Sequence, residues 1–230
     1  MIIIYRISDQ GYNKVKPKYV NNENCLRNAV KVFKNAKWSV YADNVSTETD
    51  DMIQNNVTRS DIEYVSVGHG AGTFNLALDE ALKYDDDEIV YFIENDYIHK
   101  PESSKIIKEG FELGASFVSL YDHPDKYLPP EKGGNPFCQG GAEDTRVYLG
   151  KSCHWKITNS TTMTFAAKVS TLKRVEPILR KHTNTKHPND FQMFLELRDK
   201  NELLITSIPG YSTHGETAWL SPLTDWETFI

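Results

Sequence analysis

An acidic pair stands at the end of an apolar run in the segment EIVYFIENDY, residues 88–97. The run is almost entirely apolar, as expected for a strand that is buried on both faces of a mostly parallel sheet. Side chains two positions apart on a strand point the same way, so Glu94 and Asp96 can face one ligand. Hard divalent cations prefer oxygen ligands and can bridge two phosphates. The pair therefore predicts a metal–diphosphate site, and the alternative is a solvated acidic turn.

Other polar residues also stand where apolar runs end. Arg6 and Ser8 close MIIIYRIS, Asp43 closes WSVYAD, and Asp122 and His123 follow SFVSLY. Ligands of open α/β sheets bind beyond the carboxyl ends of the strands, so these side chains are candidates for the same edge. Arg6 has a surface ion pair as its alternative role, and Asp43 has that of an ordinary turn-forming residue.

The elements that position these residues alternate between strands and helices. Short β-branched runs predict strands, and apolar residues at helical spacing predict helices. The predicted strands are 2–7, 38–43, 62–68, 88–93, 116–122, one or two within 156–169, and 202–210 as the last one. The predicted helices are 23–36, 73–84, 101–113, 171–182 and 188–200. Residues 124–148 are rich in turn formers and predict an irregular loop on the substrate side.

Composition narrows the class of protein. The 230 residues suit one α/β domain, 1–230, because no linker-like stretch separates the apolar segments. A net charge of −6 argues against broad binding to nucleic acid. No run approaches the roughly 20 apolar residues of a membrane span, so no membrane-spanning helix is expected. The three cysteines lack metal-site spacing and suit reduced thiols in a cytosol.

The motifs and their order along the chain resemble those of glycosyltransferases of the GT-A fold, including small enzymes of bacteria and large DNA viruses. The resemblance runs from Ile2 to about His214, and ENDY takes the place of the family's D-x-D motif. It implies that Asp96, and less firmly Glu94, holds Mn²⁺ or Mg²⁺. It also implies a cytoplasmic protein, in the host cytoplasm if the source is viral.

The same resemblance assigns the nucleotide-sugar donor. YRISDQ matches the segment around base and ribose, which nominates Arg6 and Ser8. Asp43 matches an acid that accepts the imide N–H of a pyrimidine, which favours a UDP- or TDP-sugar. GHGAGTFNLALDEAL resembles a Gly-x-x-x-Arg-Asn segment, so Asn75 is a donor-binding candidate. Phe74 replaces the usual arginine, and the phosphate contact would then fall to Arg6.

The resemblance also assigns catalytic and acceptor residues. Asp190 opens the predicted helix 188–200 where the family places an acidic general base, which takes the acceptor proton as the nucleophile attacks. Its alternative role is to stabilise the helix N-terminus. A late histidine of the family, here His214, would complete the metal site, and a solvated histidine is the alternative. Asp122, His123 and Trp219 are candidates for the donor-sugar and acceptor side.

The sequence thus predicts an α/β chain with a GT-A-like Rossmann-type fold, in which helices flank a central, mostly parallel sheet. Residues 1–100 would bind the nucleotide-sugar, and residues 101–230 would face a glycan or another hydroxyl acceptor. The predicted activity is metal-dependent sugar transfer that inverts the configuration at the anomeric carbon. Two alternatives are a nucleotidyltransferase, which would normally show a basic glycine-rich loop after the first strand, and a non-catalytic nucleotide- or glycan-binding module. SDQGYNK is a poor version of that loop.

Overall fold

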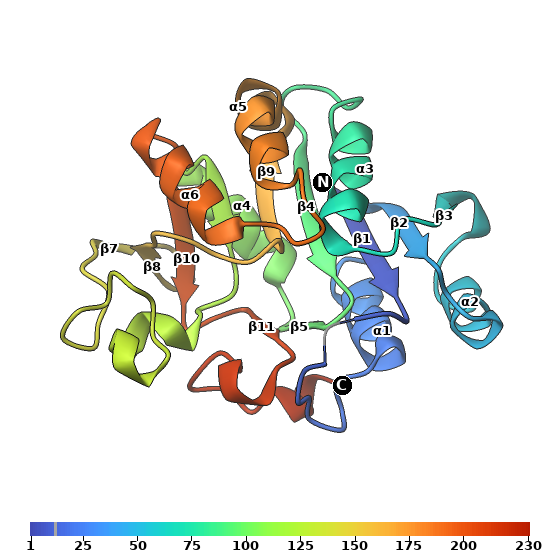
Figure 1. Ribbon diagram of the computed structural model, residues 1–230, viewed down its shortest axis with the longest axis horizontal. Coiled ribbons are helices and arrows are strands. Elements are labelled where there is room, and N and C mark those ends of the chain that lie inside the picture. The colour runs from blue at the N-terminus through green and yellow to red at the C-terminus, as the bar shows by residue number, and fades with distance from the viewer. Residues whose placement is uncertain (12) are drawn as a thin grey trace.

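The apolar N-terminal run forms strand β1 (Ile2–Ser8), as predicted, and lies in the middle of the molecule. The structure is a computed structural model that describes residues 1–11 and 13–230. β1 pairs in parallel with β2 (Lys37–Asp43) on one side and with β4 (Ile89–Glu94) on the other. Figure 1 shows these strands at the centre, with their carboxyl ends at one edge.

Over the described residues, the central sheet has nine strands in the order β3-β2-β1-β4-β9-β6-β10-β8-β7. The remaining strands of this sheet are β3 (Ile62–Val65), β6 (Phe117–Ser119), β7 (Val147–Leu149), β8 (His154–Ile157), β9 (Phe165–Lys168) and β10 (Leu204–Ile208). β9 and β8 run against the common direction of the others. The predicted mostly parallel sheet is therefore confirmed. It spans both 1–100 and 101–230, and the division into a donor half and an acceptor half stays a prediction.

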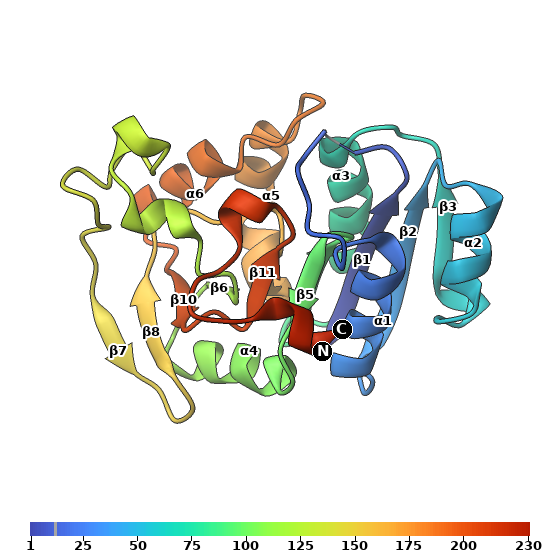
Figure 2. The ribbon, with the colours of Figure 1, turned by 90° about the horizontal axis from the view of Figure 1, so that it is seen from below.

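Two short strands form a separate antiparallel pair beside the central sheet. β5 (Tyr97–His99) follows the ENDY turn, and β11 (Ser212–His214) comes from near the end of the chain. Their register sets His214 opposite Tyr97. Figure 2 shows β5 and β11 side by side. Strand β10 was predicted to be the last strand, and β11 corrects that prediction.

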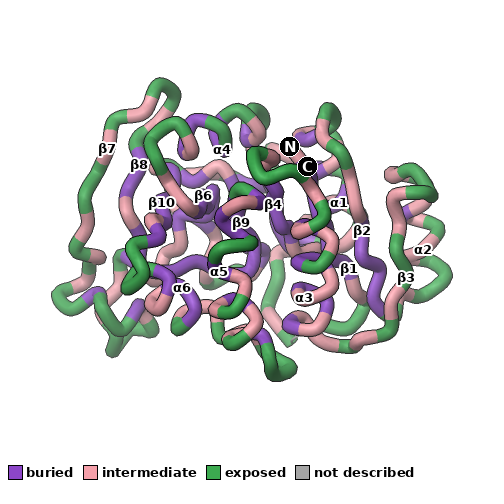
Figure 3. Tube along the Cα trace, turned by 90° about the horizontal axis from the view of Figure 1, so that it is seen from above, coloured by how far each residue is buried: buried purple, intermediate pink, exposed green. Residues whose placement is uncertain are grey.

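Helices cover both faces of the sheet because successive strand residues point to opposite sides. One face packs against α1 (Asn22–Val32), α2 (Thr47–Gln54) and α4 (Ser103–Glu112), and the other against α3 (Gly70–Ala81), α5 (Val169–His182) and α6 (Asp190–Asp199). Ile3 and Tyr5 enter the first core, whereas Ile2 and Ile4 enter the second. Figure 3 shows buried residues along the strands and exposed ones on outer helices and loops. None of the described helices is long and apolar enough to cross a membrane.

The loop predicted at 124–148 has local order in the structure. It contains the 3₁₀ turns η2 (Pro124–Tyr127) and η3 (Pro130–Lys132), and β7 begins at its end. Three further 3₁₀ turns are η1 (Arg59–Asp61), η4 (Thr217–Trp219) and η5 (Trp226–Phe229). The region 156–169 contributes two strands, β8 and β9, so the alternative of two strands there is the correct one.

Candidate active site

Asp96 lies in the turn between β4 and β5 and is almost fully buried. Its Oδ2 atom is 3.1 Å from Lys16 Nζ, 3.3 Å from Lys14 Nζ and 3.3 Å from His214 Nε2. Burial alone would raise the pKa of Asp96. His214 and the two lysine charges outweigh that effect and hold the pKa well below its ordinary value. The carboxylate is therefore ionised, with three nitrogen groups around one oxygen.

The pairing of β11 with β5 brings His214 to Asp96. The two residues are far apart in the sequence, and the register of the two strands sets His214 opposite Tyr97, the residue that follows Asp96. Gly215 makes the close approach possible, because a Cβ atom there would lie 2.8 Å from the Asp96 carbonyl oxygen and 2.2 Å from Val20 Cγ1. The structure thus brings together two of the three residues predicted to hold a metal.

Glu94, the third predicted ligand, has different partners. It is the last residue of β4, and the chain then turns, so the strand alternation does not carry Asp96 to the same place. Glu94 Oε1 is 3.4 Å from the Arg6 guanidinium, and its Oε2 receives a 3.5 Å hydrogen bond from Thr164. Within the described ranges, no three His, Cys, Asp or Glu side chains converge as they would around a metal ion.

The predicted donor residue Arg6 is buried and bonded on several sides. Its guanidinium donates to the carbonyl oxygens of Gly70 and Met163, both at 3.1 Å, and lies 5.5 Å from the Phe74 ring centre. Arg6 therefore joins the β1 end to the start of α3 and to the segment before β9. Phe74, which replaces the family's arginine, stacks on this guanidinium. The phosphate contact of Arg6 stays a prediction.

Asp43 holds the loop between β3 and α3. Its carboxylate accepts the backbone N–H of Val67 at 2.7 Å and that of Gly68 at 2.8 Å. Gly68 has a φ of +77°, a conformation that glycine adopts without steric cost. The same strand edge includes Ser8, whose carbonyl oxygen accepts a hydrogen bond from Asn95. Recognition of a pyrimidine by Asp43 and of the nucleoside by Ser8 stay predictions.

Asn75 lies in the contact between α3 and α5. Its amide donates to the Thr183 carbonyl oxygen at 2.9 Å, and its oxygen accepts from the Thr183 hydroxyl at 2.8 Å. These bonds tie α3 to the residue that follows α5. The structure does not bring Asn75 to Asp96, and its donor-binding role stays a prediction.

A polar cavity of about 180 Å³ lies at the N-terminus of α6. It is lined by His123, Asp125, Lys126, Gly134, Asn135, Pro136, Ser160, Thr161, Thr162, Asp190 and Phe191. Asp190, the predicted base, is the first residue of α6 and accepts the backbone N–H of Phe191 at 2.7 Å. Burial, with the Glu94 charge as a lesser cause, raises the pKa of Asp190 to about 6. A carboxylate of that basicity accepts a proton near neutral pH more readily than an exposed one.

The cavity wall contains a buried ammonium group that the sequence analysis did not identify. Lys126 is 2% exposed and donates to Asn159 Oδ1 and Ser160 Oγ, each at 2.7 Å. Burial lowers its pKa, and Asp125 and Glu143 oppose this shift. The cavity thus combines one ammonium group, two carboxylates, an imidazole and several hydroxyl or amide groups. Such a lining offers many hydrogen bonds to a ligand that is rich in hydroxyl groups.

His123, which lines this cavity, packs against Trp219 with ring centres 5.4 Å apart. The Tyr121 ring contacts His123 at 4.8 Å and His214 at 6.2 Å. Burial is the main cause that lowers the pKa of His123. The structure thus places His123 in the cavity wall with Trp219 packed against it, and the role of both on the donor-sugar and acceptor side stays a prediction.

Asp122 lies next to His123 in sequence but forms part of a buried ion pair. Its carboxylate is 3.0 Å from Lys156 Nζ and accepts the Tyr127 hydroxyl at 2.8 Å. Both charged side chains of this pair are about 3% exposed. These contacts link the end of β6 to β8 and η2, and a sugar contact by Asp122 stays a prediction.

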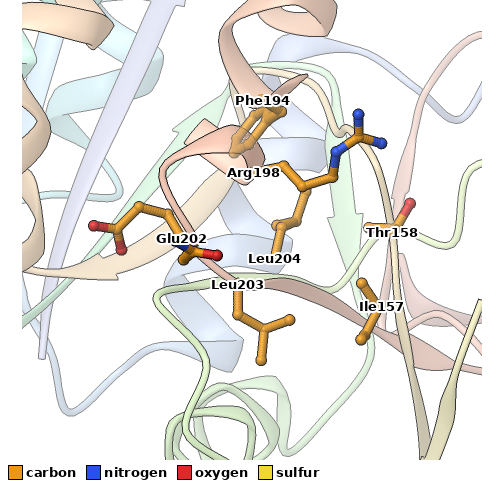
Figure 4. A pocket seen from close by; sticks show the side chains of 8 residues that line it. Ile157, Thr158, Phe194, Arg198, Glu202, Leu203 and Leu204 are labelled. Atoms are coloured by element: carbon orange, nitrogen blue, oxygen red, sulfur yellow. The ribbon is translucent and has the colours of Figure 1, made fainter. Parts of the chain in front are cut away.

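A second cavity, of about 210 Å³, lies between α6, β8 and β10. Figure 4 shows its lining, which includes Phe194, Arg198, Glu202 and Leu204. Leu204 begins β10, so this cavity is at the amino end of that strand, away from the edge where β1 and β4 end. None of the candidate site residues lines it.

Lys14 and Lys16 are two further site residues that the sequence analysis missed. They follow the first strand in the run NKVKPK. The available signal was this basic run itself, placed after a strand that leads to the predicted site edge. Lysines in such a loop ordinarily face solvent, and only the fold shows that these two reach Asp96.

No family model matches the chain, and no curated protein matches it. Solved structures do. The structure of CMP:2-keto-3-deoxy-manno-octonic acid synthetase complexed with CTP has a TM-score of 0.50 at 10% identity, over 94% of this chain and 93% of that one. The galactosyltransferase LgtC in complex with donor and acceptor sugar analogues has a TM-score of 0.46 at 10% identity, over 90% and 73%. A197 from STIV has a TM-score of 0.44 at 14% identity, over 90% and 81%.

The strand order, the helices on both faces and the likeness to the synthetase define the class of fold. It is a GT-A-like, Rossmann-type α/β fold, as the sequence predicted. An identity of 10% shows the fold alone and leaves the reaction to be argued from the site.

Proposed function

We propose that this chain is a metal-dependent glycosyltransferase that moves a sugar from a UDP- or TDP-sugar to an acceptor hydroxyl, with inversion. The observation that carries the proposal is Asp190, a carboxylate with a pKa raised to about 6 in the wall of a cavity of about 180 Å³ that is lined mainly by polar residues. The fold, in which ligands bind at the carboxyl ends of the strands, supports the same reading.

Asp96 and His214 form the part of the site that fits a metal. A carboxylate oxygen and an imidazole nitrogen 3.3 Å apart are a donor pair that Mn²⁺ accepts, and Mg²⁺ accepts the carboxylate. Two protein ligands are enough where diphosphate oxygens and water complete the coordination. A bound divalent cation would offset the negative charge that develops on the leaving diphosphate.

Asp190 would take the proton in the transfer step. The acceptor oxygen forms a bond to the anomeric carbon while the bond from that carbon to the diphosphate breaks. Asp190 removes the hydroxyl proton as the new bond forms. His123, Lys126 and Asn135 line the same cavity and are placed to orient the hydroxyl groups of the acceptor.

A nucleotidyltransferase is the second candidate, and two observations favour it. Lys14 and Lys16 follow β1 and contact Asp96. The segment that follows the first strand is therefore basic, as is normal for a nucleotidyltransferase. The likeness with the highest TM-score reported above is to a synthetase bound to CTP. Such an enzyme would release pyrophosphate from a nucleoside triphosphate, whereas a glycosyltransferase releases a nucleoside diphosphate from a nucleotide-sugar.

The released product distinguishes the two candidates. The protein is incubated with Mn²⁺, a panel of UDP- and TDP-sugars and simple glycoside acceptors, and the nucleoside diphosphate is measured. In parallel it is incubated with nucleoside triphosphates and sugar acids, and pyrophosphate is measured. We expect release of the diphosphate that depends on the acceptor, together with a glycosylated product. Pyrophosphate release without any glycoside product would contradict the proposal and support the nucleotidyltransferase.

A further inference from the structure

The Lys14 ammonium group contacts both of the atoms that would bind a metal. Its Nζ atom is 2.8 Å from His214 Nε2 and 3.3 Å from Asp96 Oδ2. Lys16 Nζ is 3.1 Å from the same Asp96 oxygen. Two lysine cations therefore contact the Asp96 oxygen, and one of them also contacts the imidazole nitrogen of His214.

The contact between Lys14 and His214 depends on the tautomer of the imidazole, because the same Nε2 atom also faces the Asp96 carboxylate. A lysine ammonium group has three hydrogen-bond donors and no acceptor, so the tautomer that bonds to Lys14 carries its proton on Nδ1 and accepts through the Nε2 lone pair. The lone pairs of Nε2 and Asp96 Oδ2 then converge on one positive centre, as they would on a divalent cation. The ammonium group of Lys14 and a metal ion cannot occupy that position together.

The two lysines are less buried than the pair that they contact. The side chains of Lys14 and Lys16 are 25% and 32% exposed, whereas those of Asp96 and His214 are 9% and 11% exposed. Both ammonium groups reach inward from the segment 13–18 and can turn outward without unpacking the core. A diphosphate at the sheet edge would attract them, because its oxygens are strong acceptors for charged donors.

We propose that Lys14 and Lys16 hold Asp96 and His214 in the ligand-free protein and move to the diphosphate when it binds. The vacated pair is then available to a divalent cation, so that diphosphate and metal bind cooperatively. The lysines would thus act in turn as a substitute for the cation and as diphosphate-binding residues. This inference rests on the metal assignment in the proposed function, although not on the identity of the sugar or the acceptor.

The test measures Mn²⁺ affinity by electron paramagnetic resonance, with and without inorganic pyrophosphate, which carries no base or sugar. The double variant Lys14→Met, Lys16→Met removes both charges and keeps the length of the side chains. Lys18→Met is the matched control, because Lys18 belongs to the same segment and is exposed. The single variant Lys16→Met retains the Lys14 contact and serves as a milder change, and the thermal midpoint verifies folding in each case.

Without pyrophosphate, we expect the double variant to bind Mn²⁺ more tightly than the wild type by about tenfold or more, a usual size for coupled sites. Pyrophosphate should increase Mn²⁺ affinity in the wild type and in Lys18→Met, and much less in the double variant. Adding Asp96→Asn to the double variant should remove its tighter binding of Mn²⁺. Equal Mn²⁺ affinity in the wild type and the double variant would overturn the lysine exchange alone. If none of the proteins binds Mn²⁺ even with pyrophosphate, both the lysine exchange and the metal assignment of the proposed function are contradicted.

Discussion

Asp190 combines two properties that rarely serve stability. It is a carboxylate held in a largely desolvated place, and its charge is opposed by that of Glu94. At neutral pH such a group destabilises the folded chain, since its charged form is better solvated in the unfolded chain. Residues with this kind of perturbed pKa cluster at functional sites. The placement therefore favours catalysis over the alternative that Asp190 only stabilises the start of α6.

Asp190→Asn should lower turnover by roughly a hundredfold or more, while donor affinity stays near that of the wild type. Asparagine has the same size but cannot take the proton. For the wild type, kcat/KM should fall as the pH falls through about 6, because protonated Asp190 cannot act as a base. The variant should lose this pH dependence. The measurement is a pH profile of product formation for both proteins.

Stability against pH provides a control for the same residue. The folded-state pKa lies above the ordinary value of 3.8, so the destabilisation is fully present above about pH 6 and disappears as both states become protonated. Asp190→Asn should therefore unfold at a higher temperature than the wild type at pH 7.5, and the gap should close towards pH 4. A gap that is the same at both pH values would show that burial does not perturb this carboxyl group.

At the level of single residues, Asp96 was predicted from the acidic pair at the end of an apolar run, whereas Asp190 and His214 were assigned by the resemblance, which also placed His214 with Asp96. The other contacts of these residues could not be predicted. Lys14 and Lys16 have no local signal beyond charge, and the contact of Arg6 with Glu94 depends on the pairing of β1 with β4. Glu94 was expected to face the same ligand as Asp96, which requires the strand to continue, but the chain turns after Glu94.

At the level of elements, the turn around η3 shapes one wall of the polar cavity. Gly134 packs so closely against the preceding turn that an added Cβ atom would lie far inside contact distance of the Leu128 backbone oxygen. A backbone atom cannot move aside as a flexible side chain can. Gly134 therefore fixes the path that brings Asn135 and Pro136 to the cavity.

Gly134→Ala should displace this turn and impair the acceptor side of the site. We expect a loss of about 1–3 kcal/mol in the free energy of unfolding, the usual cost of overpacking, and a raised KM for the acceptor. Binding of the nucleotide donor should stay near that of the wild type. The measurements are chemical denaturation, acceptor kinetics and donor calorimetry. Gly11→Ala is the control, because apart from its chain neighbours no atom of the described residues lies within 4 Å of its added Cβ. Unchanged acceptor kinetics in Gly134→Ala would exclude this turn from the acceptor site.

The long helices and the buried strands were predictable because each carries a periodic pattern over many residues. The pair formed by β5 and β11 was not, because each strand has three residues and the two come from distant parts of the chain. No local sequence pattern predicts such a pairing. This short pair nevertheless determines whether His214 reaches Asp96, so the site depends on the least predictable element of the fold.

For the whole molecule, the fold brings three parts of the candidate site together from distant segments. The lysines follow β1, the Asp96–His214 pair joins β5 to β11, and the cavity with Asp190 is lined by residues of the segments 123–162 and 190–191. This arrangement allows a nucleotide-sugar to lie across the site, with its diphosphate at Asp96 and its sugar facing Asp190. The fold class followed from the alternation of strands and helices, whereas the convergence of these segments depends on the three-dimensional structure.

The most direct test of this account is the dependence of donor binding on Mn²⁺ in the wild type and in Asp96→Ala. Calorimetry is carried out with a UDP-sugar, with and without Mn²⁺, and the thermal midpoint of each protein is measured alongside. We predict that Mn²⁺ strengthens donor binding to the wild type, and that Asp96→Ala abolishes this gain. The midpoint should fall, because the lowered pKa of Asp96 means that its charge stabilises the folded chain at neutral pH, so binding is compared below the midpoint of both proteins. If Asp96→Ala retains the full Mn²⁺-dependent gain, Asp96 does not hold the metal and the central claim is contradicted.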